Sequence, residues 1–520
     1  MSHKLEPNVA LELAVSAASN MSIKTPDWVK SAVFYQIFPD RFAKADPPTP
    51  SPAMQVPLEP WDSPPTLQGY KGGNLWGVIE KLDYLEDLGI TAIYLTPIFQ
   101  SACNHRYHTH DYYQVDPMLG GNRALRVLLD AAHKRGIKVV LDGVFNHASR
   151  GFFFFNDILE NGPHSPWLDW FKITDWPVSA YDGSFPANYV SWVDNRSLPQ
   201  FNHANPQVRE YIMQVGEYWV EFGIDGWRLD VPEQIEVEGF WQEFRDRLKK
   251  INPELYIVGE IWVDARQWLD GTQFDGVMNY LFTKEAIAFI GGEDVVPELM
   301  ERPFHRKYEP IDAAEYDRRI QHLLGLYDWE IQLTQMNLLS SHDIARLFTV
   351  LGGESGKPGA KETAIAKIKL CAVLLMTFPG VPSVYYGDEV GLGGSFDPDC
   401  RRVFPNEIDW QPEIAQCYRD LIRLRHKQLA LQRGNYQTLF LDDKIYAFSR
   451  QLETPSKTSI IVVFINVSSI ACEKKIFLSS LTNAKEIKQI YGDSEIQKNK
   501  ENKLNLSLKP QSSSIIEIKL

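Results

Sequence analysis

The alternation of short β-rich runs with helical patterns is the feature that most constrains the fold of this chain. Between residues 32 and 430, apolar runs rich in β-branched and aromatic residues are separated by segments with apolar residues at helical spacing. Parallel strands need such crossover helices, because a tight turn joins only antiparallel neighbours. Eight strands are predicted, at residues 32–38, 90–98, 137–145, 223–231, 255–262, 274–280, 332–343 and 381–389.

Eight β–α repeats favour an α/β fold of the (β/α)8 TIM-barrel type, enlarged by insertions over the usual ~250 residues. Capping signals support the helices between the runs. Asn74 and Gly89 bracket one predicted helix, and Asn205 and Gly223 bracket another. An open doubly wound sheet has the same alternation, so the count of repeats alone leaves it as an alternative.

Two segments interrupt the alternation and divide the chain. Residues 146–201 are rich in aromatic residues, Pro and Gly and lack clear helical periodicity, which predicts a small inserted domain after the third strand. After residue 432 the helical pattern stops, and two strand-like runs flank Asp442 and Asp443 as in a hairpin. We therefore predict a disordered extension at 1–27, the barrel at 28–145 and 202–432, the inserted domain at 146–201 and an antiparallel β-sandwich at 433–520.

Composition excludes several classes of partner. The net charge of −14 leaves no surplus of Lys and Arg to bind nucleic acid. No run of 18 apolar residues is present, so we expect no membrane-spanning helix, and the first 20 residues make a poor signal peptide. The cysteines, at positions 103, 371, 400, 417 and 472, are odd in number and scattered, which indicates reduced thiols in a cytoplasmic protein.

Ionisable residues collect at the ends of four predicted strands, where a barrel of this kind carries its chemistry. Arg228 and Asp230 are two residues apart and so lie on one face of a strand. One buried charge is as often structural as catalytic. Three carboxylates around one guanidinium are more than a structural ion pair needs. The polar and ionisable residues at these four strand ends are Asp142, Asn146, His147, Arg228, Asp230, Glu260, His342 and Asp343.

The residue types point to glycoside hydrolysis rather than to metal or phosphate chemistry. No HExxH motif and no Gly-rich phosphate loop occur, and the histidines stand singly on different strands. Splitting a glycosidic bond instead needs one ionised carboxylate and one protonated carboxylic acid. The 14 Trp and 22 Tyr residues supply rings that can stack on sugars.

Six ordered motifs resemble those of the α-amylase superfamily, glycoside hydrolase family 13, over residues 28–430. The motifs "DGVFNH", "GWRLDVPE", "GEIW" and "LLSSHD" match its four central blocks in order and spacing. The segments at 73–99 and 380–392 resemble its flanking blocks. "LPQFN" at 198–202 is similar to the block that marks the neopullulanase, cyclomaltodextrinase and maltogenic amylase subfamily.

The resemblance implies a role for each matching residue. Asp230 would be the nucleophile, and Arg228 would keep it ionised by lowering its pKa. Glu260 would be the general acid and base, with its pKa held higher by its surroundings. Asp343 would grip sugar hydroxyls. The implied substrate-binding residues are Tyr107, Asp142, His147, Arg228, Glu233, Trp262 and His342.

Some of these side chains have an alternative structural interpretation. Tyr107 would be the aromatic platform under the reacting sugar, or a buried ring that ends the loop after the second strand. Trp262 is a candidate acceptor-side platform or a core tryptophan. The resemblance implies no required cofactor. Calcium binding through Asn146 remains possible, but the sequence assigns no further ligands for it.

Three departures from the subfamily pattern matter. Barrel-like sequence begins near Trp28, without the usual N-terminal β domain, so we expect a monomer or a dimer not built on that domain. His108 stands at a position where the subfamily commonly has an acidic residue, and we interpret it as a solvated loop residue. Where the subfamily usually has "VANE", residues 231–234 of this chain are "VPEQ". Pro232 and Glu233 therefore occupy positions that line the acceptor side of the site in this subfamily. Both the short N-terminus and "VPE" are similar to cyanobacterial-type debranching enzymes of this subfamily, which favour α-1,6 branches.

The sequence therefore predicts a retaining glycoside hydrolase that cleaves α-1,6 bonds, α-1,4 bonds or both in an α-glucan oligosaccharide or polysaccharide. Maltodextrins, pullulan, cyclodextrins and branched glucans are the expected substrates. A glucanotransferase or isomerase of the same fold is the alternative. A non-catalytic glucan-binding relative is a third hypothesis, but it should lack one of Asp230, Glu260 and Asp343, and all three are present.

Overall fold

The computed structural model describes residues 23–48, 56–455, 457–477, 484–492, 494–499 and 503–520. The predicted N-terminal extension at 1–27 falls outside the described residues as far as residue 22. The first helix described, α2 (Asp27–Ser31), begins at the last residue of that range.

Eight parallel strands close into a barrel, as the sequence predicts. β1 (Phe34–Ile37) pairs with β2 (Ala92–Leu95) on one side and with β10 (Val381–Tyr385) on the other, so the sheet has no edge. This closure excludes the open doubly wound alternative. The remaining strands are β5 (Lys138–Gly143), β6 (Gly226–Leu229), β7 (Tyr256–Gly259), β8 (Gly276–Asn279) and β9 (Met336–Asn337), and every barrel strand lies within one predicted run.

The seventh barrel strand is much shorter than predicted. Residues 332–343 were expected as one strand, but only Met336 and Asn337 join the ladder. The serines that follow divert the backbone, because the Ser341 hydroxyl accepts from the Asp343 N–H at 3.1 Å and the Ser340 hydroxyl accepts from a later N–H at 2.9 Å. The chain therefore leaves the sheet before it reaches His342.

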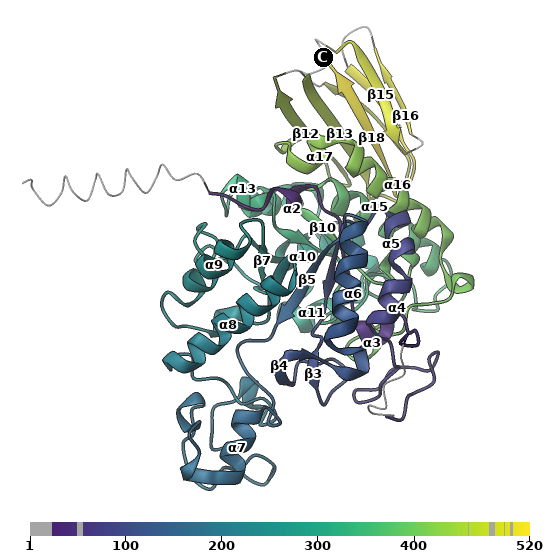
Figure 1. Cartoon of the computed structure of the whole chain (residues 1–520). Helices are drawn as coiled ribbons and strands as arrows, with labels where there is room; N and C mark the ends of the chain where they lie inside the picture. Colours follow the sequence, from purple (N-terminus) through teal and green to yellow (C-terminus); the bar gives the residue numbers. More distant parts are fainter. Residues whose placement is uncertain (1–22, 49–55, 456, 478–483, 493, 500–502) are drawn as a thin grey trace, which may run out of the picture.

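Helices cover the outside of the barrel, as Figure 1 shows. The predicted capping of α8 (Pro206–Phe222) is confirmed, since Asn205 accepts from the Gln207 N–H and Gly223 has a left-handed conformation. The helix predicted from Asn74 to Gly89 is broken at Lys81 into α4 (Leu75–Glu80) and α5 (Leu82–Leu88). The longer helices are α6 (Gly121–Lys134), α9 (Phe240–Ile251), α10 (Tyr280–Gly291), α12 (Ala313–Leu324), α15 (Ala360–Thr377) and α16 (Pro412–Lys427).

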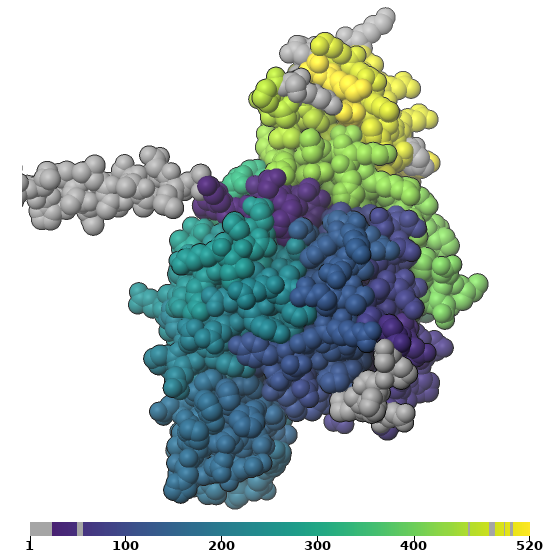
Figure 2. Space-filling model, viewed as in Figure 1, coloured from purple at the N-terminus to yellow at the C-terminus, as the bar shows by residue number. Residues whose placement is uncertain are grey.

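Two insertions lie at the carboxyl end of the barrel strands. The first is a hairpin of β3 (Phe99–Ser101) and β4 (Thr109–Val115), which the sequence pattern did not predict. The second follows β5 and forms a lobe that projects from the barrel (Figures 1 and 2). It contains one helix that the sequence pattern also missed, α7 (Phe153–Asn161), whose Phe155 is buried while Phe153 is 66% exposed.

An antiparallel β region packs against the opposite end of the barrel (Figure 1). The expected hairpin is confirmed, with β11 (Gln437–Asp442) paired to β12 (Ile445–Thr454). One sheet has the strand order β11-β12-β13-β18-β15 and the other β14-β17-β16, and apolar side chains of both form a common core. The further strands are β13 (Lys457–Asn466), β14 (Cys472–Phe477), β15 (Glu486–Tyr491), β16 (Glu495–Lys498), β17 (Lys503–Leu508) and β18 (Ser512–Lys519).

Two buried arginines tie this β region to the barrel. Arg450 of β12 donates to the carbonyl oxygens of residues 377, 431, 434 and 435 at 2.6 to 3.0 Å. Arg425 of α16 donates to the same Leu431 carbonyl at 3.0 Å and to Gly380 at 2.7 Å. Both side chains are fully buried, and burial lowers the pKa of Arg425 to about 9. The hydrogen bonds join α15, the short helix α17 (Leu429–Arg433) and β12.

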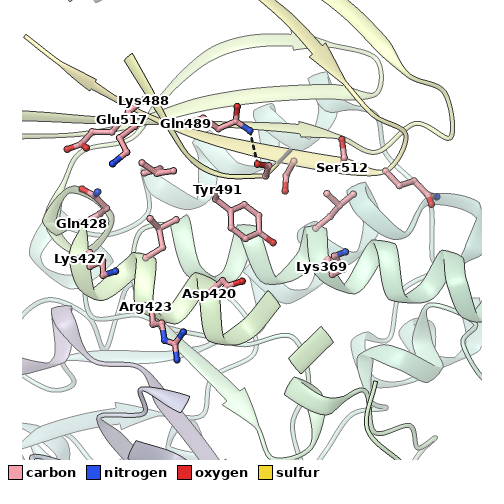
Figure 3. A pocket seen from close by; sticks show the side chains of 16 residues that line it. Lys369, Asp420, Arg423, Lys427, Gln428, Lys488, Gln489, Tyr491, Ser512 and Glu517 are labelled. Atoms are coloured by element: carbon pink, nitrogen blue, oxygen red, sulfur yellow. Dashed lines mark hydrogen bonds between the residues drawn. The ribbon is translucent and has the colours of Figure 1, made fainter. Parts of the chain in front are cut away.

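A polar hollow of about 850 Å³ lies beside this junction (Figure 3). Its walls are α15 and α16 on the barrel side and β15 and β18 on the other. The barrel side carries Lys369, Asp420 and Arg423, and the β side carries Lys488 and Glu517. The hollow contains none of the predicted site residues. No helix among the described residues is long and apolar enough to cross a membrane.

Candidate active site

Arg228 is the centre of a charged cluster at the carboxyl ends of three adjacent strands. Its Nη1 lies 2.9 Å from Asp142 Oδ1 and 3.0 Å from Asp230 Oδ1, and its Nη2 lies 2.8 Å from Glu260 Oε2. β5 supplies Asp142, β6 ends at Leu229 just before Asp230, and Glu260 directly follows β7. Because the guanidinium is fully buried, its charge is little screened by solvent. One rigid cation therefore sets the position of three carboxyl groups.

Burial opposes the effect of this cation on the acidic residues. Arg228 lowers the pKa of Asp142 and Asp230, but desolvation is the larger effect, and the net pKa of each is raised. Glu260 and Asp343 raise the pKa of Asp230 further by repulsion. The ion pair with Arg228 predicts a lowered pKa for Asp230, but burial and the neighbouring carboxyl groups reverse that direction. In the protein without substrate, Asp230 is harder to ionise than a free aspartate.

Glu260 is held by two donors besides Arg228. The Val231 N–H donates to its Oε2 at 3.3 Å, and Trp262 Nε1 donates to its Oε1 at 3.1 Å. The Trp262 ring stacks on Tyr280 with centroids 3.7 Å apart, so one of its faces is covered by protein. Trp262 therefore packs against protein on one face, as the core interpretation expects, and also orients a carboxyl group, while its role as a sugar platform stays a prediction.

Tyr107 lies beside His342 and Asp142. Its ring is parallel to that of His342, with centroids 5.5 Å apart and an interplanar angle of 4°, and its hydroxyl contacts His342 Nε2. The same hydroxyl donates to Asp142 Oδ2 at 3.1 Å. Burial and the charge of Arg228 hold the pKa of His342 well below its usual range, so the imidazole is neutral. Gln36 lies 2.8 Å from the other ring nitrogen and fixes the orientation of the ring.

Asp343 is the most exposed acid of the group, with 29% of its side chain accessible. One oxygen lies 3.1 Å from His342 Nε2, and the other lies 3.7 Å from Arg401 Nη2. Burial and repulsion from Glu260 raise the pKa of Asp343 to about 7. Its protonation state therefore changes near neutral pH.

His147 and Asn146 follow β5 and lie under the inserted lobe. His147 stacks on Trp192 with centroids 5.3 Å apart, and its buried Nε2 has no hydrogen-bond partner in the described protein. Asn146 Oδ1 accepts from Gln200 Nε2 at 2.9 Å, so a calcium ion would have to displace that donor. A ligand that offers an acceptor to His147 would satisfy its buried nitrogen.

The "VPE" segment is strained and lies next to Glu260. Val231 has φ 36° and ψ 50°, a left-handed conformation that is costly for a β-branched residue. Glu233 follows on a single 3-10 turn, and one of its oxygens is buried without a hydrogen-bond partner. Burial and repulsion from Glu260 raise the pKa of Glu233 to about 7.

Sequence reasoning missed three residues that complete the cluster. Tyr94 of β2 donates to Asp142 at 2.5 Å, Gln36 of β1 contacts His342, and Arg401 approaches Asp343. Gln36 is the one polar residue of an otherwise apolar strand, which is a signal that the sequence offered. Tyr94 and Arg401 carry no such signal, because a tyrosine in an apolar strand and an arginine in a loop are common.

Comparisons with known proteins agree with this geometry. Residues 36–423 match the model of the alpha amylase catalytic domain. Neopullulanase 2 of Thermoactinomyces vulgaris is 42% identical over 435 residues, which cover 82% of this chain and 68% of that protein. A crystal structure of the Nostoc punctiforme debranching enzyme in its native form is 58% identical with a TM-score of 0.87, covering 95% of this chain and 100% of that one.

A third relative is more distant in sequence but equally complete. The ligand-bound structure of the cyclic α-maltosyl-(1→6)-maltose hydrolase of Arthrobacter globiformis is 32% identical, with a TM-score of 0.80. It covers 95% of this chain and 100% of that chain. The similarity therefore spans the barrel, the inserted lobe and the C-terminal β region together.

Proposed function

Since the chain belongs to the α-amylase family of glycoside hydrolases, we propose that it cleaves α-glucosidic bonds by double displacement with retention of configuration. The observation that carries the proposal is the shared guanidinium: Arg228 contacts Asp230 through one Nη and Glu260 through the other. A retaining mechanism needs two carboxyl groups close together on either side of the scissile bond, about 5–5.5 Å apart. A rigid planar cation that contacts both carboxyl groups holds them near each other.

Asp230 is the proposed nucleophile. It attacks the anomeric carbon while Glu260 gives its proton to the departing glycosidic oxygen, which leaves a covalent glycosyl-enzyme. Glu260 then takes a proton from water, and the resulting hydroxide displaces Asp230 from the sugar. As Asp230 loses its charge in the first step, Arg228 keeps its hydrogen bonds to Asp142 and its ion pair with Glu260.

The remaining residues are proposed to hold the reacting sugar ring. Asp343 accepts hydrogen bonds from ring hydroxyls, and the neutral His342 donates a hydrogen bond to a ring hydroxyl. The unpartnered Nε2 of His147 supplies a further donor. Tyr107 offers its ring as the stacking platform, held parallel to His342. Hydrogen bonds that tighten as the ring flattens lower the barrier more than bonds to the resting sugar do.

The proposed substrates are branched α-glucans, pullulan, cyclodextrins and maltodextrins, with a preference for α-1,6 bonds. The names of the Nostoc debranching enzyme and of the Arthrobacter hydrolase support that preference, as does the "VPE" segment beside Glu260. Pro232 restricts the turn after Asp230, and Glu233 projects a carboxyl group at the acceptor side. We also propose a cytoplasmic location, because all five cysteines are free.

Parallel digestion of pullulan, β-cyclodextrin, a branched maltodextrin and its enzymatically debranched counterpart tests the proposal. We expect faster release from the branched substrate than from its linear counterpart. Proton NMR of the first product should show the α-anomer. Asp230→Asn should abolish turnover while the unfolding midpoint is kept. No product from any substrate would contradict hydrolysis, and longer chains without a net gain of reducing ends would favour the transferase alternative.

Activity that survives treatment with a chelator is expected, since no step needs a metal ion.

A further inference from the structure

The turn of the β3–β4 hairpin brings three soft ligand atoms together. Cys103, His105 and His108 each offer one atom, and these atoms all lie within 4.8 Å of one another. Among the described residues, this is the one group of three or more Cys, His, Asp or Glu side chains arranged in this way. His108 is half-buried against the edge of the His105 ring, with centroids 5.1 Å apart, and is not the solvated loop residue that the sequence suggested.

The separation of the first two atoms matches that of two ligands on one tetrahedral ion. Cys103 Sγ lies 3.5 Å from His105 Nδ1. Bond lengths of about 2.3 Å for Zn–S and about 2.0–2.1 Å for Zn–N place the two ligand atoms about 3.5 Å apart at a tetrahedral angle. The His108 nitrogen lies within 4.8 Å of the other two ligand atoms, so it must move closer to them to bind the same ion. The hairpin therefore needs only a small adjustment to close around an ion.

The chemistry of the donors selects a zinc-type ion over calcium. One thiolate and two imidazoles suit Zn²⁺ and its soft neighbours, whereas Ca²⁺ takes oxygen ligands. A neutral imidazole binds such an ion through the lone pair of one ring nitrogen. All three side chains are partly exposed, so an ion reaches them from solvent.

Nearby cations oppose an ion at this position. The charges of Arg41, Arg106 and Arg401 all act on His105. Deprotonation of Cys103 offsets one positive charge of a divalent ion, and Asp116 neutralises Arg106 at 3.1 Å. The selectivity of the site therefore depends on the thiolate, since imidazoles alone would leave the full charge of the ion facing the arginines.

We propose that Cys103, His105 and His108 bind one Zn²⁺ ion with a fourth position open to water. Binding releases the Cys103 thiol proton to solvent. The site is separate from the proposed hydrolysis, and its test does not depend on any glucan. An ion here clamps the loop that carries Tyr107, because Tyr107 lies between two of the ligands. The Tyr107 N–H donates to His105 Nδ1 at 3.2 Å in the ion-free protein, and ligation through Nδ1 replaces that hydrogen bond.

Cobalt titration of the full-length, reduced, chelator-stripped protein tests this site. We expect one equivalent of Co²⁺ to produce a thiolate-to-cobalt charge-transfer band and tetrahedral d–d bands, and one equivalent of Zn²⁺ to remove them. Cys103→Ser should abolish the charge-transfer band. His108→Asn should weaken Zn²⁺ binding at least about tenfold in competition with a chromophoric chelator.

Cys472→Ser is the matched control, because Cys472 is also a partly exposed free thiol but lies in the C-terminal β region. It should leave the bands unchanged. Circular dichroism and the unfolding midpoint of each variant establish that the fold is kept. The proposal is overturned if the wild type gives no charge-transfer band, if the band survives Cys103→Ser, or if it is lost in Cys472→Ser.

Discussion

Replacing Arg228 with lysine tests whether one planar cation organises the site. The guanidinium makes contacts at 2.9 and 3.0 Å through Nη1 and at 2.8 Å through Nη2, to three different carboxyl groups. An ammonium is a single point of charge on a flexible stem. It can approach the Asp142 and Asp230 pair or Glu260, but it cannot replace both Nη atoms at once.

The variant therefore loses at least one buried, charge-assisted bond, either the ion pair with Glu260 or hydrogen bonds to Asp142 and Asp230. Such a bond contributes about 1.5–3 kcal/mol, which corresponds to a fall in kcat/KM of about 10- to 150-fold. If the lost contact is the one to Asp230, the pKa of that carboxyl rises further, because Arg228 is the group that lowers it. The acidic limb of the pH profile then moves to higher pH, since the nucleophile must be ionised to react.

Initial rates of pullulan and maltotriose hydrolysis between pH 4 and 8, with the unfolding midpoint of each protein, measure both effects. Arg346→Lys is the matched control. Arg346 is also fully buried, and it holds Asp388 at 3.1 Å and the Tyr386 carbonyl at 2.7 Å. The Arg346→Lys variant should have a lower unfolding midpoint but the same acidic limb in its pH–rate profile. A kcat/KM of Arg228→Lys within about threefold of the wild type, or an equal shift in both variants, would refute the reasoning.

Three further substitutions test other parts of the structure. Tyr94→Phe removes the 2.5 Å donor to Asp142 and should lower kcat/KM about tenfold without unfolding the protein; an unchanged steady-state rate would remove Tyr94 from the site. Glu233 has a folded pKa of about 7, above its unfolded value, so its burial destabilises the protein progressively between pH 4.5 and 7. Glu233→Gln should therefore raise Tm at pH 8 and leave it unchanged at pH 4, and equal shifts at both pH values would contradict this. Arg450→Met removes four hydrogen bonds, of which only the one to Leu431 leaves a carbonyl that Arg425 still contacts, and should lower the free energy of unfolding by about 2–4 kcal/mol; a urea midpoint equal to that of the wild type would show that water replaces the guanidinium.

The order of the barrel strands could be predicted because both the strand and the helix of a β–α repeat have local sequence signals. Apolar β-branched runs identify the strands, and Asn205 with Gly223 marks the two ends of one helix. Strand length was harder, as the early end of β9 shows. Hydroxyl groups that bond the local backbone compete with the ladder, and that competition depends on geometry rather than on composition.

The residues of the candidate site also differ in how far the sequence could predict them. Arg228, Asp230 and Glu260 were predicted because each ends a predicted strand, and such ends converge in a barrel. The hairpin of β3 and β4 was not predicted, since it is short and its turn has no typical hairpin signal. The spacing of Cys103, His105 and His108 within six residues was a local signal that the sequence offered, but without the hairpin their side chains could not be placed together. The net pKa of Asp230 was missed for a related reason, because it depends on neighbours from three other strands.

The crowding of acids around Arg228 has a consequence for how such a protein evolves. Asp142, Asp230 and Glu260 contact one fully buried cation and Asp343 lies close by, and burial together with mutual repulsion raises the pKa of Asp142, Asp230 and Asp343. An amide in place of one acid would relieve that repulsion in the resting protein. A library selected for heat resistance alone should therefore accumulate Asn or Gln at these positions and lose turnover, whereas selection for growth on glucan should keep the acids. The most heat-resistant sequence for this barrel is then expected to be an inactive one.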